Sequence, residues 1–228
     1  MSRSSRSSAW LVDVRLWLLR HGETDSNRGG VFQGQLDIPL NDEGITQARL
    51  TAERLANVRF GRIYASDLSR AGETARIIAE RQQVGVELDA DLREMHYGVL
   101  QGLRYDLAAE TLSAHGMADA IEGIRLLGAS TRPPGGESVR VVRNRAVRFL
   151  RRVESDNQAS HVSDILIVAH GGQLRILMTV LFELPLAARS AFAFANCGMS
   201  RVSTYQDRRV LDFHNLILWK DDGQPFTR

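Results

Sequence analysis

The sequence predicts an α/β fold, a three-layer α/β/α sandwich with a mostly parallel central sheet and a small helical insertion over one face. Short apolar runs alternate with longer amphipathic segments, as strands and helices do in α/β domains. Residues 164–169 (DILIVA) form the clearest of these runs, as expected for a parallel strand covered on both faces. Two of the runs end in His-Gly, at His21 and His170, which would bring two similar loops to one edge of the sheet.

The first half of the chain predicts three strands, with a helix after each of the first two. The run at residues 14–19 (VRLWLL) stops abruptly at Arg20-His21-Gly22, so it reads as a buried strand that leads into a polar loop. The apolar residues that follow recur at helical spacing and predict amphipathic helices. The remaining elements are a helix capped by Asn41 or Asp42, a strand at residues 62–66, a helix capped by Ser66-Asp67 and a strand at residues 86–88.

An Ala- and Leu-rich stretch at about residues 103–131 interrupts the alternation, so we interpret it as the insertion. The alternation resumes after a loop that contains Pro and Gly, at residues 132–136. We expect a single domain at residues 11–228, because no linker or repeat divides it, and a disordered tail at residues 1–10. The elements expected after the loop are helices at residues 137–154 and 171–182 and strands at residues 164–169, 199–205 and 210–218.

The composition argues against several classes of protein. Hydrophobic residues make up 43% of the chain and charged residues 25%, which is ordinary for a soluble globular protein. Charges of both signs are interspersed around a net charge of +2, so no basic stripe suggests nucleic acid. The apolar stretch interrupted by Asp13 and Arg15 is too short to cross a membrane and has no signal-peptide cleavage site. Cys197 is the sole cysteine, so no intrachain disulfide forms and a cytoplasmic location is expected.

Two histidines are the first candidates for chemistry. A lone histidine at the end of a strand is more often structural, but His21 and His170 share the same strand-His-Gly context. Ligands of open α/β sheets bind outside the carboxyl ends of the strands, so both imidazoles would face one crevice. Arg20 offers a planar fork for phosphate oxygens, and the backbone N–H groups of the helix after Gly171 add a positive dipole end.

Other phosphate and acyl chemistries find little support in the sequence. It contains neither the G-x-x-x-x-G-K-[ST] loop nor a G-x-G-x-x-G after a strand. Cys197 lacks the residues that surround a catalytic cysteine, and no serine lies in a G-x-S-x-G elbow. No cluster has clear metal-ligand spacing, so we expect neither a metal nor a cofactor.

Several sequence blocks together resemble the histidine phosphatase superfamily, which is also called phosphoglycerate-mutase-like. The triplet Arg20-His21-Gly22 alone would be a weak signal, but the blocks occur in family order and cover most of residues 19–196. The blocks are Leu19 to Asn27, Gln33 to Leu40, Gly44 with Gln47-Ala48, Ser66 to Ala71 with Thr74-Ala75, Leu92 to Gly98 with Gln101-Gly102, Gly135 to Ser138, and Val168 to Gly171.

The resemblance implies a role for individual residues. His21 would be a nucleophile that is phosphorylated transiently, and Glu94 would be the general acid that protonates the leaving oxygen. Negative neighbours raise the pKa of a carboxyl group, which suits an acid beside a bound phosphate. The residues implied to hold the phosphoryl group are Arg20, Arg70 and His170, and those implied to line the phosphate pocket are Asn27, Gln33, Gly34, Tyr97, Gly171 and Gly172.

The expected reaction is hydrolysis of a small phosphorylated metabolite, with the insertion covering the active site and no metal taking part. A cofactor-dependent phosphoglycerate mutase is the alternative, and a phosphate-binding module without turnover is a less favoured one. A mutase must exclude water, whereas residues 103–131 are short and offer only Arg104 and Arg125 as cations. Asp91 or Asp106 would be the acid if Glu94 were not, and a homodimer is common in the family. We expect His96 to be a packing residue.

Overall fold

The computed structural model describes residues 13–117, 130–160, 162–205 and 208–220, and a six-stranded sheet lies at its centre. The strand order is β3-β2-β4-β1-β5-β6. The first four of these strands are parallel to one another, and β5 and β6 are antiparallel additions at one edge. The strands are β1 (Arg15–Arg20), β2 (Arg62–Ala65), β3 (Val86–Leu88), β4 (Asp164–Ala169), β5 (Met199–Tyr205) and β6 (Arg208–Leu216).

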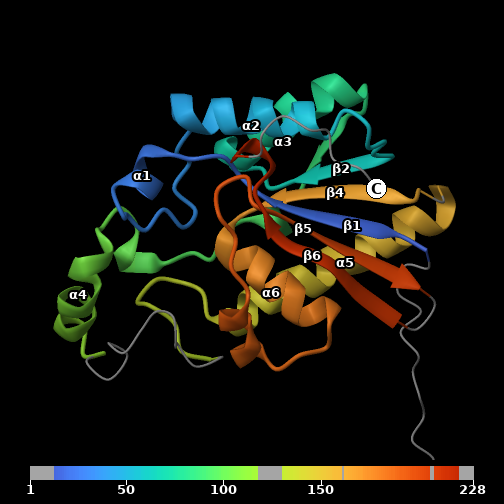
Figure 1. The fold of residues 1–228 in the computed structure, drawn as a ribbon. Helices are drawn as coiled ribbons and strands as arrows, with labels where there is room; N and C mark the ends of the chain where they lie inside the picture. Colours follow the sequence, from blue (N-terminus) through green and yellow to red (C-terminus); the bar gives the residue numbers. More distant parts are fainter. Residues whose placement is uncertain (1–12, 118–129, 161, 206–207, 221–228) are drawn as a thin grey trace, which may run out of the picture.

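Helices cover both faces of the sheet, as Figure 1 shows, and the predicted three-layer α/β class is confirmed. One face carries α2 (Asp42–Arg54) and α3 (Ser69–Gln82), and the other carries α5 (Val139–Ser160) and α6 (Gly171–Leu181). Alternate residues of β1 enter different cores: Leu16 and Leu18 pack with the α5 and α6 side, and Trp17 and Leu19 with the α2 and α3 side. Because the middle of β1 is buried on both faces, its four central residues are all apolar, and an arginine stands at each end.

The N-termini of α2 and α3 are capped in different ways. Of the two predicted caps of α2, Asn41 is the one observed, because its side chain accepts a hydrogen bond from Gly44 N (2.8 Å). The predicted cap of α3 by Ser66-Asp67 was wrong, because the helix begins at Ser69 and both side chains have other partners. The Ser69 N–H instead donates to the carboxylate of Asp37 (2.7 Å), which comes from the loop before α2.

In its described part, the segment predicted as an insertion contains the short helix Tyr105–Leu107 (η3) and α4 (Ala108–Ala114). Together with α1 (Asp25–Arg28), α4 lies beyond the end of the sheet at which β1, β2 and β4 finish (Figure 1). Residues 118–129 of the expected insertion and the expected N-terminal tail at 1–10 lie outside the described residues. The segments around α1 and α4 therefore lie next to the carboxyl ends of β1 and β4.

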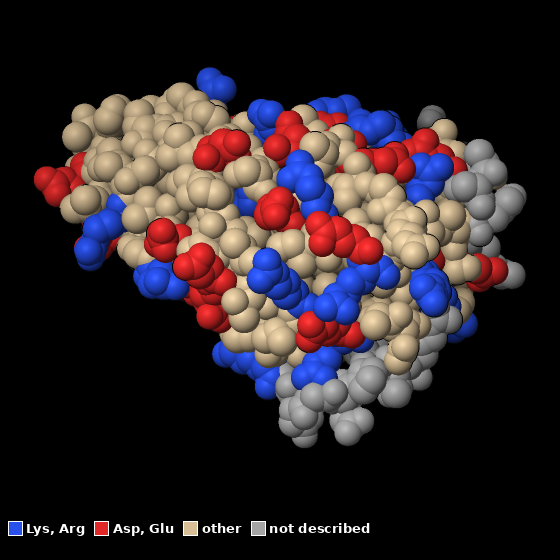
Figure 2. Space-filling model, turned by 90° about the horizontal axis from the view of Figure 1, so that it is seen from above, with Lys and Arg blue, Asp and Glu red and all other residues tan. Residues whose placement is uncertain are grey.

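The face formed by α2 and α3 carries cations and carboxylates side by side, with no extended patch of either sign (Figure 2). Arg81 pairs with Glu53 across the two helices (3.0 Å), and Arg76 pairs with Glu73 along α3 (3.3 Å). Exposed pairs of this kind contribute about 0–1 kcal/mol each, so this surface adds little to stability. Among the described helices, none has the length and apolar character that a membrane crossing requires.

Candidate active site

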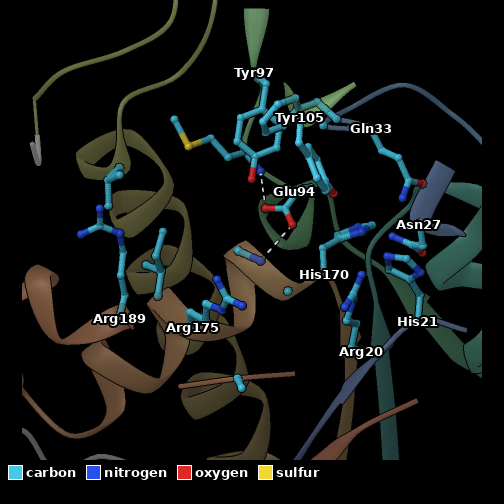
Figure 3. A pocket seen from close by; sticks show the side chains of 18 of the residues that line it. Arg20, His21, Asn27, Gln33, Glu94, Tyr97, Tyr105, His170, Arg175 and Arg189 are labelled. Atoms are coloured by element: carbon cyan, nitrogen blue, oxygen red, sulfur yellow. Dashed lines mark hydrogen bonds between the residues drawn. The ribbon is translucent and has the colours of Figure 1, made fainter. Parts of the chain in front are cut away.

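A cavity of about 830 Å³ lies at the carboxyl ends of β1 and β4 (Figure 3). Its walls come from segments that are far apart in the sequence, including the loop after β1, the segment around η3 and α4, and the start of α6. Every residue predicted for the site lines this cavity: Arg20, His21, Asn27, Gln33, Gly34, Arg70, Glu94, Tyr97, His170, Gly171 and Gly172.

The His21 ring is held in one orientation. Its backbone N–H donates to Ala169 O (3.0 Å), which ties the loop after β1 to the end of β4. Nδ1 lies 2.7 Å from the carbonyl oxygen of Gly22. Because a carbonyl can only accept, Nδ1 carries the proton and the lone pair of the neutral ring is on Nε2. Burial, with the charges of Arg70 and Arg20, holds the pKa of His21 well below its usual range and so keeps the ring neutral.

His170 faces His21, and the two ring centroids are 5.1 Å apart. Its Nε2 lies 2.9 Å from the hydroxyl oxygen of Ser66, the residue that directly follows β2. Its Nδ1 is buried and has no hydrogen-bond partner among the described residues. Burial and the charge of Arg70 lower the pKa of His170 well below the usual value. Both histidines are therefore uncharged at neutral pH, and the positive charge around them comes from arginine.

Arg20 and Arg70 supply that charge, and each is anchored by backbone carbonyl groups. Arg20 Nη1 donates to Phe194 O (2.8 Å), and the two terminal nitrogens of Arg70 donate to Leu36 O (2.8 Å) and Gly34 O (2.7 Å). The Nε atom of each arginine is buried without a hydrogen-bond partner in the described structure. Burial lowers the pKa of Arg70 to about 10 and lowers that of Arg20 as well, so both remain cationic at pH 7.

Among the described residues that line the cavity, Glu94 alone carries a carboxylate. One carboxyl oxygen accepts from Met95 N (2.8 Å) and the other from Gly172 N (2.9 Å), at the start of α6 (Figure 3). A Cβ atom added to Gly172 would lie 2.3 Å from Glu94 Oε1, closer than two such atoms can approach. Glycine at this position therefore allows Glu94 to reach the N-terminus of α6.

The backbone around Glu94 is held by a partly buried ion pair between Arg145 of α5 and Glu137 (2.8 Å). Arg145 donates to the carbonyl oxygens of Arg93 (2.9 Å) and Glu94 (3.2 Å). Glu137 accepts from the backbone N–H of His96 (2.9 Å). Glu137 belongs to a block that the sequence analysis recognised, but Arg145 lies in no such block and was missed.

Asn196 connects the loop after β1 to the rest of the site. Its side-chain nitrogen donates to His21 O (3.2 Å), Gly22 O (3.1 Å) and Asn27 Oδ1 (3.0 Å). Asn27 in turn accepts from the backbone N–H of Thr24 (3.2 Å), in a capping box that begins α1. Sequence reasoning missed Asn196, because it lies in an irregular segment before β5 with no motif around it.

Further lining residues also escaped the sequence analysis. Arg175 had a usable signal, since it lies one helical turn after Gly171 and so shares its face of α6. Arg189 lies in the short helix Leu186–Ala191 (η5), where no pattern pointed to it. The other cavity residues that were not predicted are Phe32, Met95, Tyr105, Ala108, Ala109, Val139, Ile176, Ser190, Phe192 and Ala193.

The two alternative acids, Asp91 and Asp106, do not line the cavity. Asp91 pairs with arginines of α5, and Asp106 pairs with Arg104 on the surface (2.8 Å). His96 also lies outside the cavity lining, and its Nδ1 accepts from Gly98 N (3.0 Å). Within the described residues, no three His, Cys, Asp or Glu side chains gather as a metal site would need.

The fold and the paired histidines at the sheet edge agree with a comparison of the sequence with known families. The sequence model of the histidine phosphatase superfamily (branch 1) matches residues 16–217, so the chain belongs to this superfamily.

The similar proteins carry the names of different enzymes, a mutase and two phosphatases. A relative from Yersinia pestis, named probable phosphoglycerate mutase GpmB, is 35% identical over 196 residues, which cover 85% of this chain and 86% of the relative. The structure of mycobacterial glucosyl-3-phosphoglycerate phosphatase with VO3 matches with a TM-score of 0.77 and 35% identity, over 89% of this chain and 98% of that chain. The alpha-ribazole phosphatase from Shigella flexneri matches with a TM-score of 0.78 and 30% identity, over 89% of this chain and 96% of that chain.

Proposed function

We propose that this protein is a phosphatase that hydrolyses a small phosphorylated metabolite through a phosphohistidine on His21, without a metal ion. The observation that carries the proposal is the orientation of His21. Its ring is neutral, its proton is committed to Gly22 O, and the arginines that lower its pKa are the natural ligands of a phosphoryl group. Membership of the superfamily and the phosphatases among the matched structures support this assignment.

In the first step, the lone pair on His21 Nε2 attacks phosphorus and the bond from phosphorus to the ester oxygen breaks. Arg20, Arg70 and His170 hold the phosphoryl oxygens and neutralise their charge. Ser66 Oγ accepts from Leu68 N (3.3 Å) and lies 2.9 Å from His170 Nε2, which fixes the orientation of the His170 ring. Protonated Glu94 gives its proton to the departing oxygen, and the alcohol leaves. The Gly22 carbonyl stabilises the positive phosphohistidine ring through Nδ1–H.

In the second step, a water molecule attacks the phosphorus of phosphohistidine. The Glu94 carboxylate, which was left unprotonated by the first step, takes a proton from that water. The bond between nitrogen and phosphorus breaks, phosphate leaves, and both His21 and Glu94 return to their starting states. Division into two displacements replaces one difficult transfer by two easier ones.

A cofactor-dependent phosphoglycerate mutase is the second candidate, because the relative from Yersinia pestis bears that name and two further arginines line the cavity. We favour the phosphatase on the argument from water exclusion. Of the cations in the expected insertion, Arg104 is exposed and paired with Asp106, and it does not line the cavity. Arg125 lies outside the described residues.

The deciding assay follows isomer conversion and free phosphate together, with 3-phosphoglycerate in the presence and absence of 2,3-bisphosphoglycerate. A broad panel of phosphomonoesters, with EDTA present and with His21→Ala as the inactive control, completes the experiment. Release of phosphate from several esters with little isomerisation is the expected result. Isomerisation much faster than release would establish the mutase instead. Phosphate binding without any turnover would leave only a binding module.

A further inference from the structure

The carbonyl group of Gly22 decides which nitrogen of His21 is free to react. Its oxygen lies 2.7 Å from Nδ1, so the ring proton is held there and the lone pair is on Nε2. If the peptide group between Gly22 and Glu23 turned, this acceptor would be lost and the proton would be free to occupy Nε2. A ring protonated on Nε2 has no lone pair to attack phosphorus with that atom. The orientation of one peptide group therefore controls the nucleophile.

The opposite end of the same peptide group is held by Gln47 of α2. The Glu23 N–H, which lies trans to the Gly22 carbonyl, donates to Gln47 Oε1 (3.0 Å). Because a backbone N–H can only donate, the oxygen of the Gln47 amide, and not its nitrogen, must face Glu23. The Gln47 side chain is buried, so little water reaches this bond.

A further hydrogen bond fixes the Gln47 amide in turn. Its Nε2 donates to the carboxylate of Glu43, one turn earlier in α2 (3.2 Å). The three bonds thus run in one direction, from the His21 ring through the peptide group and the amide to a carboxylate. Bonds in such a chain polarise one another, which favours a ring that becomes positive as phosphohistidine. Glu43 is exposed and its charge is screened, so the inner bond from Gln47 is the important one.

The first turn of α2 lies directly against the loop that carries His21. A Cβ atom added to Gly44 would lie 2.1 Å from Glu23 O, and one added to Gly22 would lie 2.4 Å from Gly44 O. The Asn41 N–H donates to Glu23 O (3.0 Å) at the same contact. Two glycines therefore let the backbones approach closely enough for the Gln47 side chain to reach the loop.

We propose that Gln47 is a positioning residue for the nucleophile: it holds the Glu23 N–H and thereby keeps the Gly22 carbonyl on His21 Nδ1. This inference rests on the proposed function, since it takes His21 Nε2 as the attacking atom. Gln47 is not among the residues that line the cavity, so it acts through the peptide group and not on the substrate.

The test compares Gln47→Met, which keeps the length of the side chain but removes the acceptor, with Gln47→Glu, which retains an acceptor oxygen. Gln47→Met should lower kcat about 10- to 100-fold, because a misplacement of about 1 Å costs about 100-fold in rate. Gln47→Glu should keep most of the wild-type kcat. Inhibition by inorganic phosphate should be unchanged in both variants, because Arg20 and Arg70 keep their backbone anchors.

Gln82→Met is the matched control. Gln82 is also a buried glutamine, at the end of α3, and its Nε2 donates to Leu55 O (3.1 Å) away from the cavity. The same substitution there reports the general cost of burying methionine in place of glutamine, and it should leave kcat near that of the wild type.

NMR spectra of ¹⁵N-labelled histidine in the resting protein report the tautomer of His21 without any turnover. The proton should be on Nδ1 in the wild type, in Gln47→Glu and in Gln82→Met, whereas Gln47→Met should show a population with the proton on Nε2. If Gln47→Met does not fold, Gln47→Asn takes its place, because its amide is one methylene group too short to reach Glu23.

An unchanged tautomer in the Gln47 variant, or a loss of kcat no larger than in Gln82→Met, would overturn the positioning role and leave the phosphatase in place. A wild type that hydrolyses no ester, together with the expected tautomer change, would refute the phosphatase and retain the role of Gln47 in orienting His21.

Discussion

Replacement of Gly172 by alanine should displace the proposed general acid, although Glu94 itself is unchanged. The new Cβ would lie 2.3 Å from Glu94 Oε1 and 3.0 Å from its carboxyl carbon. Ordinary contacts begin near 3.4 Å, so the carboxylate must move by about 1 Å, and a misplacement of about 1 Å costs about 100-fold in rate. The neighbouring variant Gly171→Ala is the matched control, because its Cβ would meet nothing closer than Arg20 Nε at 3.7 Å.

The assay compares alkyl and aryl phosphates, since aryl leaving groups need little protonation. For alkyl esters, Gly172→Ala should lose about 100-fold and approach Glu94→Gln, for which removal of an acid predicts about 10²–10⁴-fold. For aryl esters both losses should be much smaller, and Gly171→Ala should lose less than Gly172→Ala on every substrate. Equal losses in the two alanine variants, or equal losses on both classes of ester, would refute the role assigned to Glu94.

Three further predictions concern the support, charge and metal requirement of the site. Asn196→Ala should lower kcat by about tenfold or more, because the Asn196 side chain donates to His21 O and Gly22 O. The effect of Asn196→Asp on kcat should depend on pH. An unchanged kcat in the alanine variant would contradict this positioning role. In an NMR titration the His21 ring should remain neutral at about pH 6. Arg70→Gln should raise the pKa of His21, because the variant removes a cation that disfavours protonation of the ring. A His21 pKa near the usual value in the wild type would contradict the electrostatics described for the site. Chelators should leave turnover unchanged, and loss of activity in EDTA with recovery on added metal would show that the mechanism is wrong.

The fold and the two histidines could be predicted because they depend on patterns that are local in the sequence. A buried strand with both faces covered must be apolar, and a strand that ends in His-Gly places its imidazole at the sheet edge. Pairing of β1 with β4 then brings His21 beside Ala169, directly before His170. The adjacency of the two histidines follows from this pairing.

Glu94 was identified only by resemblance, because no local rule points to it. It follows the short turn Ala90–Leu92 (η1) in an irregular segment, and its orientation depends on Gly172, which is distant in sequence. Arg145, which holds the same segment, acts through backbone carbonyls that no motif records. Contacts of this kind exist only once the chain has folded.

Ser66 illustrates how a tertiary contact overrides a local preference. Serine before a helix is a strong cap signal, yet its hydroxyl contacts His170 and the helix begins three residues later. The N-terminus of α3 is served instead by Asp37, from a separate loop. Ser66 therefore contacts His170 of the candidate site instead of capping α3.

The most direct test of the central proposal is to trap the phosphoenzyme. Rapid quench of the wild type with a ³²P-labelled ester should place the label on His21, in an acid-labile and base-stable linkage that is typical of a phosphoramidate. His21→Ala should trap no label and lose about 10⁶-fold in rate, as removal of a nucleophile does in comparable covalent mechanisms. Label on another residue, or undiminished labelling of His21→Ala, would contradict the account.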